Sequence, residues 1–470
     1  MPDAATSVSY LNLISGLGLL TMVGLAWLMS SHRSRVNWRL VVTGIGLQLM
    51  LGVIFFNSQS WTFDGQFENG VLFYAFDAFF GLIKDWADQG GTFVFGAFAD
   101  SPNGADANFP AANPFFLLKT FAFGVLPTVI FFAALMSVLY HIGIMEPIVR
   151  AMAWVMQRLL GTSGSESLAA AANVFVGHTE APLVVKPYIS TMTRSELNAM
   201  MVGGFATITG GLMAIFVNIG VSAGHLVTAS IISAPAALII AKILQPETEE
   251  SETLGTVNVK FEKQAANVIE AAANGASDGM KLAINIAAML IAFLALIAMF
   301  DAILYGVGEL VEKIVYGSVS DPADANDIHW SLGGLFGIIF WPFAWIMGIE
   351  SSDCAVSGRL LGTKMVVNEF IAYMDLSAVL TDMQENGKAA TASISKRTEI
   401  ILTYALCGFS NFGAIGIQLG GIGPLAPNRK SDLAQLGFRA MLGGMLACCM
   451  TACVAGLLYG VFDWLSTAAG

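Results

Sequence analysis

Charged residues are scarce in this chain of 470 residues: Asp, Glu, Lys and Arg make up 12% of it, whereas 56% of the residues are hydrophobic. Soluble domains usually carry about 25% charged residues. So few charges exclude a water-soluble enzyme, a nucleic-acid-binding protein and a disordered chain. The 22 Lys and Arg are also outnumbered by 34 Asp and Glu. The resulting net charge of -12 argues against nucleic acid or anionic lipid as the main partner.

Several patterns that carry enzyme chemistry are missing as well. The sequence contains no HExxH, Walker or CxxC pattern, and its five cysteines show no metal or disulfide spacing. No basic region precedes the first apolar run, so that run is not predicted to be a cleavable signal. One enzyme alternative remains, because Gly-Thr-Ser-Gly at 161–164 matches the G-x-S-G pattern of intramembrane serine proteases, with His178 as a conceivable base. Ser163, however, lies in a small-residue turn before a hairpin rather than inside a span.

Long apolar runs are what the sequence has in abundance. Runs of about 20 residues predict membrane-spanning helices, and eight of them lie at 11–30, 38–56, 115–140, 199–221, 226–244, 282–305, 400–419 and 436–462. Three further stretches, 71–88, 146–160 and 332–348, predict helices that lie in the membrane interface. The expected fold class is therefore an all-α polytopic membrane protein.

The distribution of basic residues predicts the orientation. Lys and Arg are more frequent in the loops of one side, among them Arg33, Arg150 and Arg429. Because basic loops stay on the inner side of a membrane, both termini are expected to lie outside. The acidic stretch 245–262 is then a cytoplasmic linker.

An internal repeat runs through the chain. RSEL at 194–197 precedes GFATI at 204–208, and RTEI at 397–400 precedes GFSNF at 408–412. Each is preceded by a short apolar leg, a polar tip that contains a Glu, and a second leg. A leg of about ten residues spans about 15 Å, half a bilayer, so each pair of legs is expected to enter and return on one side. The two hairpins start from opposite sides, and such inverted repeats with Gly-interrupted helices point to a transporter site at the midplane.

This repeat predicts four parts of the chain. Residues 1–142 form N-terminal scaffold helices, 143–244 the first inverted repeat, 245–331 the acidic linker with a scaffold helix, and 332–470 the second repeat. A channel is an alternative to a transporter, and it would show no accumulation against a gradient.

Five motifs in these repeats resemble the concentrative nucleoside transporter family: GHTEAPL (177–183), GGFATITG (203–210), PETEES (246–251), LLGTKMVVNEFIAY (360–373) and CGFSNFGAIGIQLGGIGPLAPNR (407–429). The resemblance implies import of nucleosides by symport with sodium, across the bacterial inner membrane. It also implies eight spans, two re-entrant hairpins, three interfacial helices, a homotrimer, and an elevator motion of the hairpin-bearing domain. No organic cofactor is expected. Proton coupling through a tip carboxylate or His178 is the alternative to sodium.

The resemblance also assigns site residues. The first tip, His178, Thr179 and Glu180, would face the base, while Glu369 and Asn411 would hold the ribose hydroxyls with Phe409 beside them. Sodium would be bound by the side chains of Asn173 and Thr207 and the carbonyls of Val176 and Ile208. A carboxylate suits vicinal hydroxyls because it is an acceptor-only group with two oxygens. An ionisable residue inside a membrane is in any case a functional candidate.

Two residues depart from the family pattern. Many members carry Gln where this chain has His178, and a Ser on the ribose side where this chain has Ala414. Neutral His offers one donor and one acceptor on opposite sides of a rigid ring. The expected specificity therefore differs from that of uridine-preferring relatives, either broader across purines or tuned to a modified pyrimidine nucleoside.

Overall fold

The computed structural model describes residues 4–57, 71–95, 126–178, 180–254, 265–315, 330–386 and 393–459. These residues form helices and no strand, which confirms the all-α class. In chain order the helices are α1 (Ala4–Leu28), η1 (Arg33–Arg35), α2 (Trp38–Asn57), α3 (Val71–Phe95), α5 (Leu126–His141), α6 (Met145–Leu160), α7 (Gly164–Asn173), α8 (Ala181–Val184), α9 (Lys186–Ile189), α10 (Arg194–Ala206), α11 (Gly210–Asn218), α12 (Ala223–Leu244), α13 (Val268–Val315), α14 (Leu332–Ile346), α15 (Cys354–Val366), α16 (Glu369–Asn386), α17 (Lys396–Leu406), α18 (Phe412–Ile422), η6 (Pro427–Arg429) and α19 (Lys430–Leu458).

Within the described ranges, six helices are long and apolar enough to cross a membrane, or up to seven if the bent pair α5–α6 is counted as one span. The apolar run at 115–140 lies partly outside the described residues and is represented by α5. The run at 400–419 is divided between α17 and α18. The number of spans therefore depends on how the broken helices are placed in the bilayer.

Two helices of the repeats are broken at equivalent places. Between α10 and α11 the chain is extended, and Thr209 caps α11 by accepting a hydrogen bond from the Leu212 N–H at 3.2 Å. Between α17 and α18 it is extended again, and Asn411 caps α18 by accepting from the Ala414 N–H at 2.8 Å. A side-chain oxygen thus satisfies a backbone donor that the break exposes.

The two breaks touch each other. A Cβ on Gly408 would lie 2.8 Å from the carbonyl oxygen of Phe205 and 2.6 Å from Sγ of Cys448. Only glycine permits this close backbone approach. The sequence motif G-F-S-N therefore places the second break directly against the end of α10.

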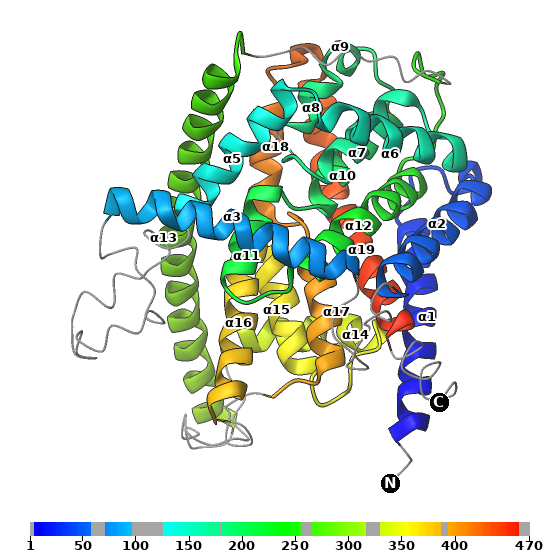
Figure 1. Ribbon diagram of the computed structural model, residues 1–470. Helices are drawn as coiled ribbons and strands as arrows, with labels where there is room; N and C mark the ends of the chain where they lie inside the picture. Colours follow the sequence, from blue (N-terminus) through cyan, green and yellow to red (C-terminus); the bar gives the residue numbers. More distant parts are fainter. Residues whose placement is uncertain are drawn as a thin grey trace, which may run out of the picture.

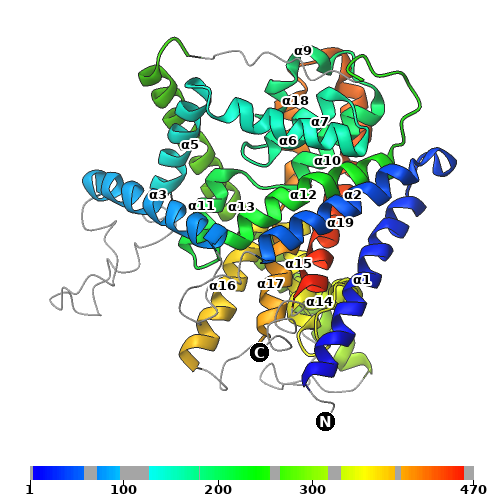
Figure 2. The ribbon, with the colours of Figure 1, turned by 45° about the vertical axis from the view of Figure 1, so that its right-hand side comes forward.

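Two helical hairpins precede the broken helices. Hairpin 1 (residues 164–189) comprises α7, α8 and α9, and its second leg is interrupted because Pro182 and Pro187 each start a new short helix. Hairpin 2 (residues 354–386) comprises α15 and α16. In both ribbon views hairpin 1 lies at the upper end with α6, whereas hairpin 2 lies at the lower end with α14 and α17 (Figures 1 and 2). The repeats are thus arranged in opposite directions.

Helix α13 is longer than predicted, with 48 residues instead of a span at 282–305. Its N-terminal half packs against α5 through small residues: a Cβ on Gly275 would lie 2.6 Å from the carbonyl oxygen of Ala133, and one on Gly279 2.8 Å from Cα of Ile130. This stripe lets the helix begin at Val268, well before the predicted span. Helix α3 also runs past residue 88, to Phe95, and crosses α13 in Figure 1.

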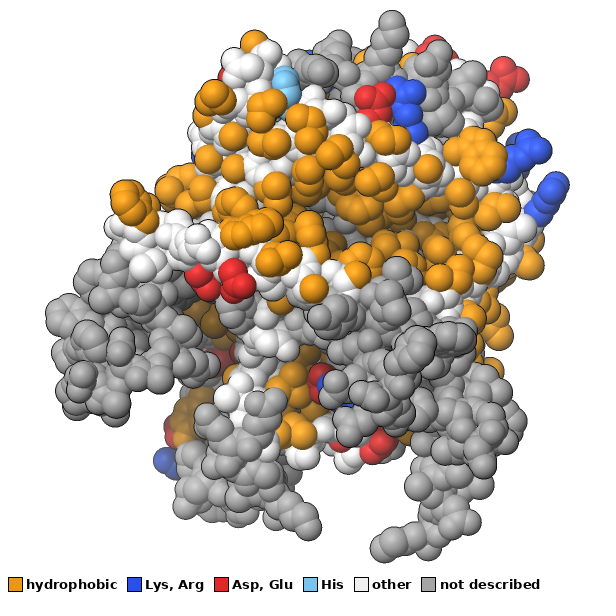
Figure 3. Space-filling view, viewed as in Figure 1, with side chains coloured by type: hydrophobic (Ala, Val, Ile, Leu, Met, Phe, Trp, Pro, Cys, Tyr) orange, Lys and Arg blue, Asp and Glu red, His pale blue; other side chains and the backbone are white. Residues whose placement is uncertain are grey.

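Burial separates inner from outer helices. The apolar windows of α10–α11, α12 and α19 are each 89% buried, compared with 39% for α1, 33% for α2 and 6% for α13. The face in Figure 3 carries a broad apolar region in its upper and middle part, and the basic side chains at the upper right lie beside this region. The broken helices that carry the candidate site therefore belong to the interior of the protein.

Candidate functional site

The tip of hairpin 1 packs against the first helix break. Past Asn173 the chain turns, and the Gly177 N–H donates to Oε2 of Glu180 at 2.6 Å. A Cβ on Gly177 would lie 2.8 Å from Cγ2 of Thr209, and the Gly210 N–H donates to the carbonyl of Phe175 at 3.3 Å. The tip and the break between α10 and α11 are thus held together by direct contacts.

The four predicted sodium ligands come from these two segments. Both side-chain polar atoms of Asn173 are buried and have no hydrogen-bond partner. The Thr207 hydroxyl donates to the carbonyl of Gly203 at 2.9 Å, which leaves its lone pairs free. The carbonyls of Val176 and Ile208 accept no hydrogen bond from any described residue. These oxygens are the kind of ligand that suits a hard cation, supplied partly by unwound backbone.

The predicted ribose ligands meet at the second break. Glu369 begins α16 and is 3% exposed. Its Oε2 accepts from Nδ2 of Asn411 at 3.1 Å. Lys364 is close enough to Glu369 to interact with its charge, but its ammonium group donates to the carbonyl of Ala405 at 2.7 Å. The structure therefore provides a buried carboxylate and amide side by side, with no side-chain ion pair between Glu369 and a described basic residue.

The predicted base-side residues lie next to this pair. The His178 ring is buried, and both ring nitrogens lack a hydrogen-bond partner. Its centroid lies 4.5 Å from that of Phe409 in an edge-to-face arrangement. Glu180 points instead towards an open cavity, and Thr179 lies outside the described residues. The structure thus joins His178 to the second break through Phe409, while Glu180 forms the boundary with the cavity.

The cavity beside Glu180 has a volume of about 670 Å³. Hairpin 1, α5, α6, α11 and α13 contribute to its lining, and its acidic and phenolic groups are Glu146, Glu180, Asp278 and Tyr140. It extends to Lys186 in α9 and to Leu425 after α18. The tip of hairpin 1 is therefore accessible from the end of the molecule that carries α9.

Comparison with known proteins identifies the family of this chain. Residues 17–98, 122–223 and 225–456 match the profiles described as "Na+ dependent nucleoside transporter N-terminus", "Nucleoside recognition" and "Na+ dependent nucleoside transporter C-terminus". An "Uncharacterized transporter" of Haemophilus influenzae is 39% identical over 450 residues, which cover 96% of this chain and 98% of that protein. The chain belongs to the Na+-dependent nucleoside transporter family.

Members from vertebrates are longer. Human "Solute carrier family 28 member 3" is 39% identical over 455 residues, or 95% of this chain and 60% of the human protein. The chain likewise spans 60% of the Eptatretus stoutii protein of that name. Vertebrate members of the Na+-dependent nucleoside transporter family thus contain sequence beyond the matched region.

Solved structures of the Na+-dependent nucleoside transporter family show the same fold. CNTnw in an inward-facing, substrate-bound state matches with a TM-score of 0.81 and 36% identity, over 96% of this chain and 98% of that one. A doubly substituted variant of CNTnw in an outward-facing state matches with a TM-score of 0.83 and 35% identity, over 96% of this chain and 100% of that one. Both conformations share this arrangement of helices.

Membership in this transporter family excludes the serine-protease alternative, and the structure explains the G-x-S-G match. Ser163 caps α7 in a capping box with Glu166, whose Oε1 accepts from the Ser163 N–H at 2.7 Å. His178 makes no hydrogen bond to this serine. The Gly-Thr-Ser-Gly segment is a helix start.

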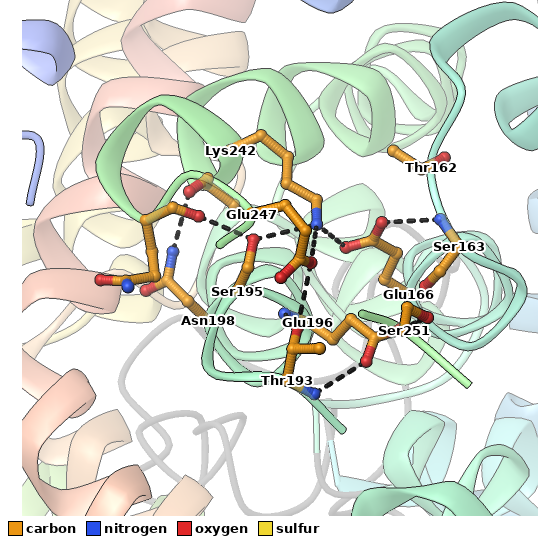
Figure 4. A network of polar contacts seen from close by, with 12 residues as sticks. Thr162, Ser163, Glu166, Thr193, Ser195, Glu196, Asn198, Lys242, Glu247 and Ser251 are labelled. Carbon is orange, nitrogen blue, oxygen red and sulfur yellow. Dashed lines mark hydrogen bonds and ion pairs between the residues drawn. The ribbon is translucent and has the colours of Figure 1, made fainter. Parts of the chain in front are cut away.

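A buried polar network fixes hairpin 1 to the start of α10 (Figure 4). Lys242 forms ion pairs with Glu166 at 2.7 Å and with Glu247 at 3.1 Å. Glu196 accepts from hydroxyls of Ser165 at 3.1 Å and Ser251 at 2.6 Å. The network explains the PETEES motif, because Glu247 and Ser251 of this motif belong to it. Together these contacts hold the first leg of hairpin 1, the start of α10 and the end of α12 in one unit.

The second repeat has a simpler version of this clamp. Asp353, which precedes α15, accepts from the Ser395 N–H at 2.9 Å and from the Thr398 hydroxyl at 2.7 Å. Hairpin 2 is thereby fixed to the start of α17. In both repeats a carboxylate joins the hairpin to the helix that is later broken.

Sequence reasoning missed Gln418, which is fully buried in α18. It also missed the glycine pair at positions 203 and 204, against which Asn173, His178 and Gln418 pack. The available signal was a single amide seven residues after Asn411, on the same side of a glycine-rich apolar helix.

Proposed function

We propose that this protein imports nucleosides by symport with sodium ions. The observation that carries the proposal is the set of unpartnered buried polar atoms on Asn173 and His178, located between the two hairpins and the two helix breaks. More than nine in ten buried polar groups in proteins have a partner. A cluster of exceptions next to broken helices is therefore best explained by ligands that complete the hydrogen bonding and coordination.

Sodium would occupy the space between Asn173 and Thr207. Their side chains and the carbonyls of Val176 and Ile208 supply oxygen ligands from both sides of the contact between hairpin 1 and the first break. Because the ion would join hairpin 1 to the break between α10 and α11, its binding would stabilise the tip of hairpin 1, which contacts the nucleoside. This coupling accounts for symport without a contact between sodium and nucleoside.

The nucleoside would lie between the two tips. Glu369 and Asn411 face the ribose hydroxyls, the ring of Phe409 covers the sugar and the base, and His178 meets the base. Thr179 and Glu180 complete the first tip. The carboxylate of Glu369 has acceptor capacity left beside the bond from Asn411, which matches a donor pair on the sugar.

We further propose the membrane arrangement expected from the sequence. It comprises eight spans, re-entrant hairpins 1 and 2, and three interfacial helices, α3, α6 and α14, in the bacterial inner membrane with both termini outside. The four parts, 1–142, 143–244, 245–331 and 332–470, are scaffold, first repeat, linker with scaffold helix, and second repeat. The opposed positions of the hairpins (Figure 1) and the many exposed residues of α3 and α13 support this arrangement.

An elevator movement would carry the site across the membrane. The two carboxylate clamps make each hairpin rigid with its broken helix, as a moving domain requires. The cavity at Glu180 opens towards α9, the side assigned to the cytoplasm, so this conformation would be inward-facing. The static α3, α5 and α13 would form the scaffold and the contacts of a homotrimer.

Uptake of labelled nucleosides into proteoliposomes tests this proposal. We expect accumulation that requires an inward sodium gradient and that stops when choline replaces sodium. Accumulation that ignores sodium and collapses with the proton gradient would establish proton coupling instead. Equilibration without accumulation would indicate a channel.

A further inference from the structure

Gln418 has an unused hydrogen-bond acceptor inside the protein. Its side chain is fully buried, and Nε2 donates to the carbonyl of Met201 in α10 at 3.1 Å. Its Oε1 is buried and has no partner among the described residues. The bond to Met201 fixes the amide orientation, because a flipped amide would turn oxygen towards oxygen.

The position of this amide is the candidate site. A Cβ on Gly204 would lie 2.6 Å from Nε2 of Gln418 and 2.7 Å from Cβ of His178. The amide and the imidazole are therefore neighbours across a position that has no side chain. Both carry polar atoms without partners, and the His178 ring also contacts Phe409.

Helix α18 connects this point to the ribose end. Its buried residues are Ala414, Gln418 and Ile422, and Asn411 caps its start. Asn411 and Gln418 are seven residues apart, which is two turns and about 10 Å along the axis. One side of α18 thus presents, in order, the amide that contacts Glu369, the small Ala414, and the amide beside His178.

We propose that Gln418 reads the base of the transported nucleoside, together with His178. This inference rests on the proposed function and names a specificity-determining residue for it. Oε1 accepts from an N–H on the hydrogen-bonding edge of the base, and the second hydrogen of Nε2 is left to donate to the adjacent acceptor. Ala414 leaves room along α18 for the bound molecule.

A carboxamide suits several bases at once. Uracil and hypoxanthine offer an imino N–H beside a carbonyl oxygen, and adenine and cytosine offer an amino N–H beside a ring nitrogen. All four edges present an adjacent donor and acceptor, which one amide can pair with. The expected specificity is therefore broad across purines and pyrimidines, and it excludes bases whose edge N–H is replaced by a methyl group.

The competing explanation is that Gln418 only bridges two helices, as polar residues in membrane bundles often do. Gln48 provides the matched control. It is also fully buried, its Nε2 donates to the carbonyl of Ile232 at 3.2 Å, and its Oε1 also lacks a partner. It joins α2 to α12 rather than α18 to α10. A substitution by Met removes the amide at either place and keeps the length of the side chain.

The test compares KM values for sodium-driven uptake by wild type, Gln418→Met and Gln48→Met. The substrate pairs are uridine with 3-methyluridine and inosine with 1-methylinosine. We expect wild type to prefer the unmethylated partner. Gln418→Met should raise the KM of the unmethylated nucleosides about three- to tenfold, the range of one hydrogen bond, and reduce the preference. Gln48→Met should leave the preference unchanged.

Three results would overturn the inference: equal uptake of methylated and unmethylated substrates by wild type, an unchanged preference in Gln418→Met, or the same loss in both variants. If Gln418→Met does not elute as a folded protein, the same comparison with Gln418→Asn, which keeps an amide but shortens the side chain by one methylene, decides instead. Absence of sodium-driven uptake of every nucleoside by wild type would refute the proposed function instead.

Discussion

Replacing Glu369 by Gln tests the proposed contact of this residue with the ribose hydroxyls. The substitution keeps the size of a side chain that is 3% exposed, and the Gln oxygen can still accept the bond from Asn411. It removes the negative charge and one acceptor oxygen. Hydrogen bonds to a charged group contribute about 1.5–3 kcal/mol. At about 1.4 kcal/mol per factor of ten, the affinity for ribonucleosides should fall about 10- to 150-fold.

The assay is nucleoside binding to the purified protein by calorimetry, with uridine and 2′,3′-dideoxyuridine. The dideoxy analogue lacks the hydroxyls that the carboxylate would bind, so its affinity should be unchanged by Glu369→Gln. Glu270→Gln, at an exposed position near the start of α13, controls for the loss of one negative charge. Uridine affinity close to wild type in Glu369→Gln would refute the assignment. An equal loss for both ligands would mean that the substitution disturbs the fold around Asn411.

Three further predictions concern the network, the glycine pair and the base. Lys242→Met leaves the buried carboxylate of Glu166 without its ion pair and should lower the free energy of unfolding in detergent by about 3–5 kcal/mol. Lys281→Met, in an exposed pair, should have almost no effect, and equal losses in the two variants would contradict this reasoning. Gly204→Ala should lower the free energy of unfolding by about 1–3 kcal/mol through overpacking and should weaken nucleoside binding. Gly46→Ala, at a position with open space around it, should leave the free energy of unfolding unchanged. A stable, fully active Gly204→Ala variant would disprove the close contact. His178→Gln should shift the ratio of uridine to adenosine affinity towards uridine by about 0.5–1.5 kcal/mol, and an unchanged ratio would show that His178 only packs.

The sequence was sufficient for the features that depend on local patterns. The glycines of the two motifs around Thr207 and Asn411 predicted helix interruptions, and the structure has both. Polar tips between short apolar legs predicted two re-entrant hairpins; the structure has short helices on either side of each tip, and their re-entry into the membrane stays a prediction. Helix interruptions and turns are determined by the backbone preferences of a few adjacent residues, so they can be predicted from local sequence.

Features that depend on contacts between distant segments were not predictable. The extension of α13 depends on small residues that fit against α5, and nothing in the linker composition indicates that partner. The second leg of hairpin 1 was expected as one helix, although Pro182 and Pro187 could have shown that it divides. The sequence did not identify Gln418 as a candidate site residue, because a single amide in an apolar helix often only bridges two helices. Its position beside His178 is evident only from the fold.

The crowding at Gly204 limits how this transporter can evolve. Position 204 has no space for a side chain while His178, in the tip of hairpin 1, and Gln418, in α18, lie against it. If positions 178 and 418 read the base as proposed, an enlargement of one side chain beside Gly204 should be tolerated only when the other becomes smaller. Among homologues these two positions should covary while glycine persists at 204. Homologues that prefer another nucleoside should then differ from this chain at positions 178 and 418 together.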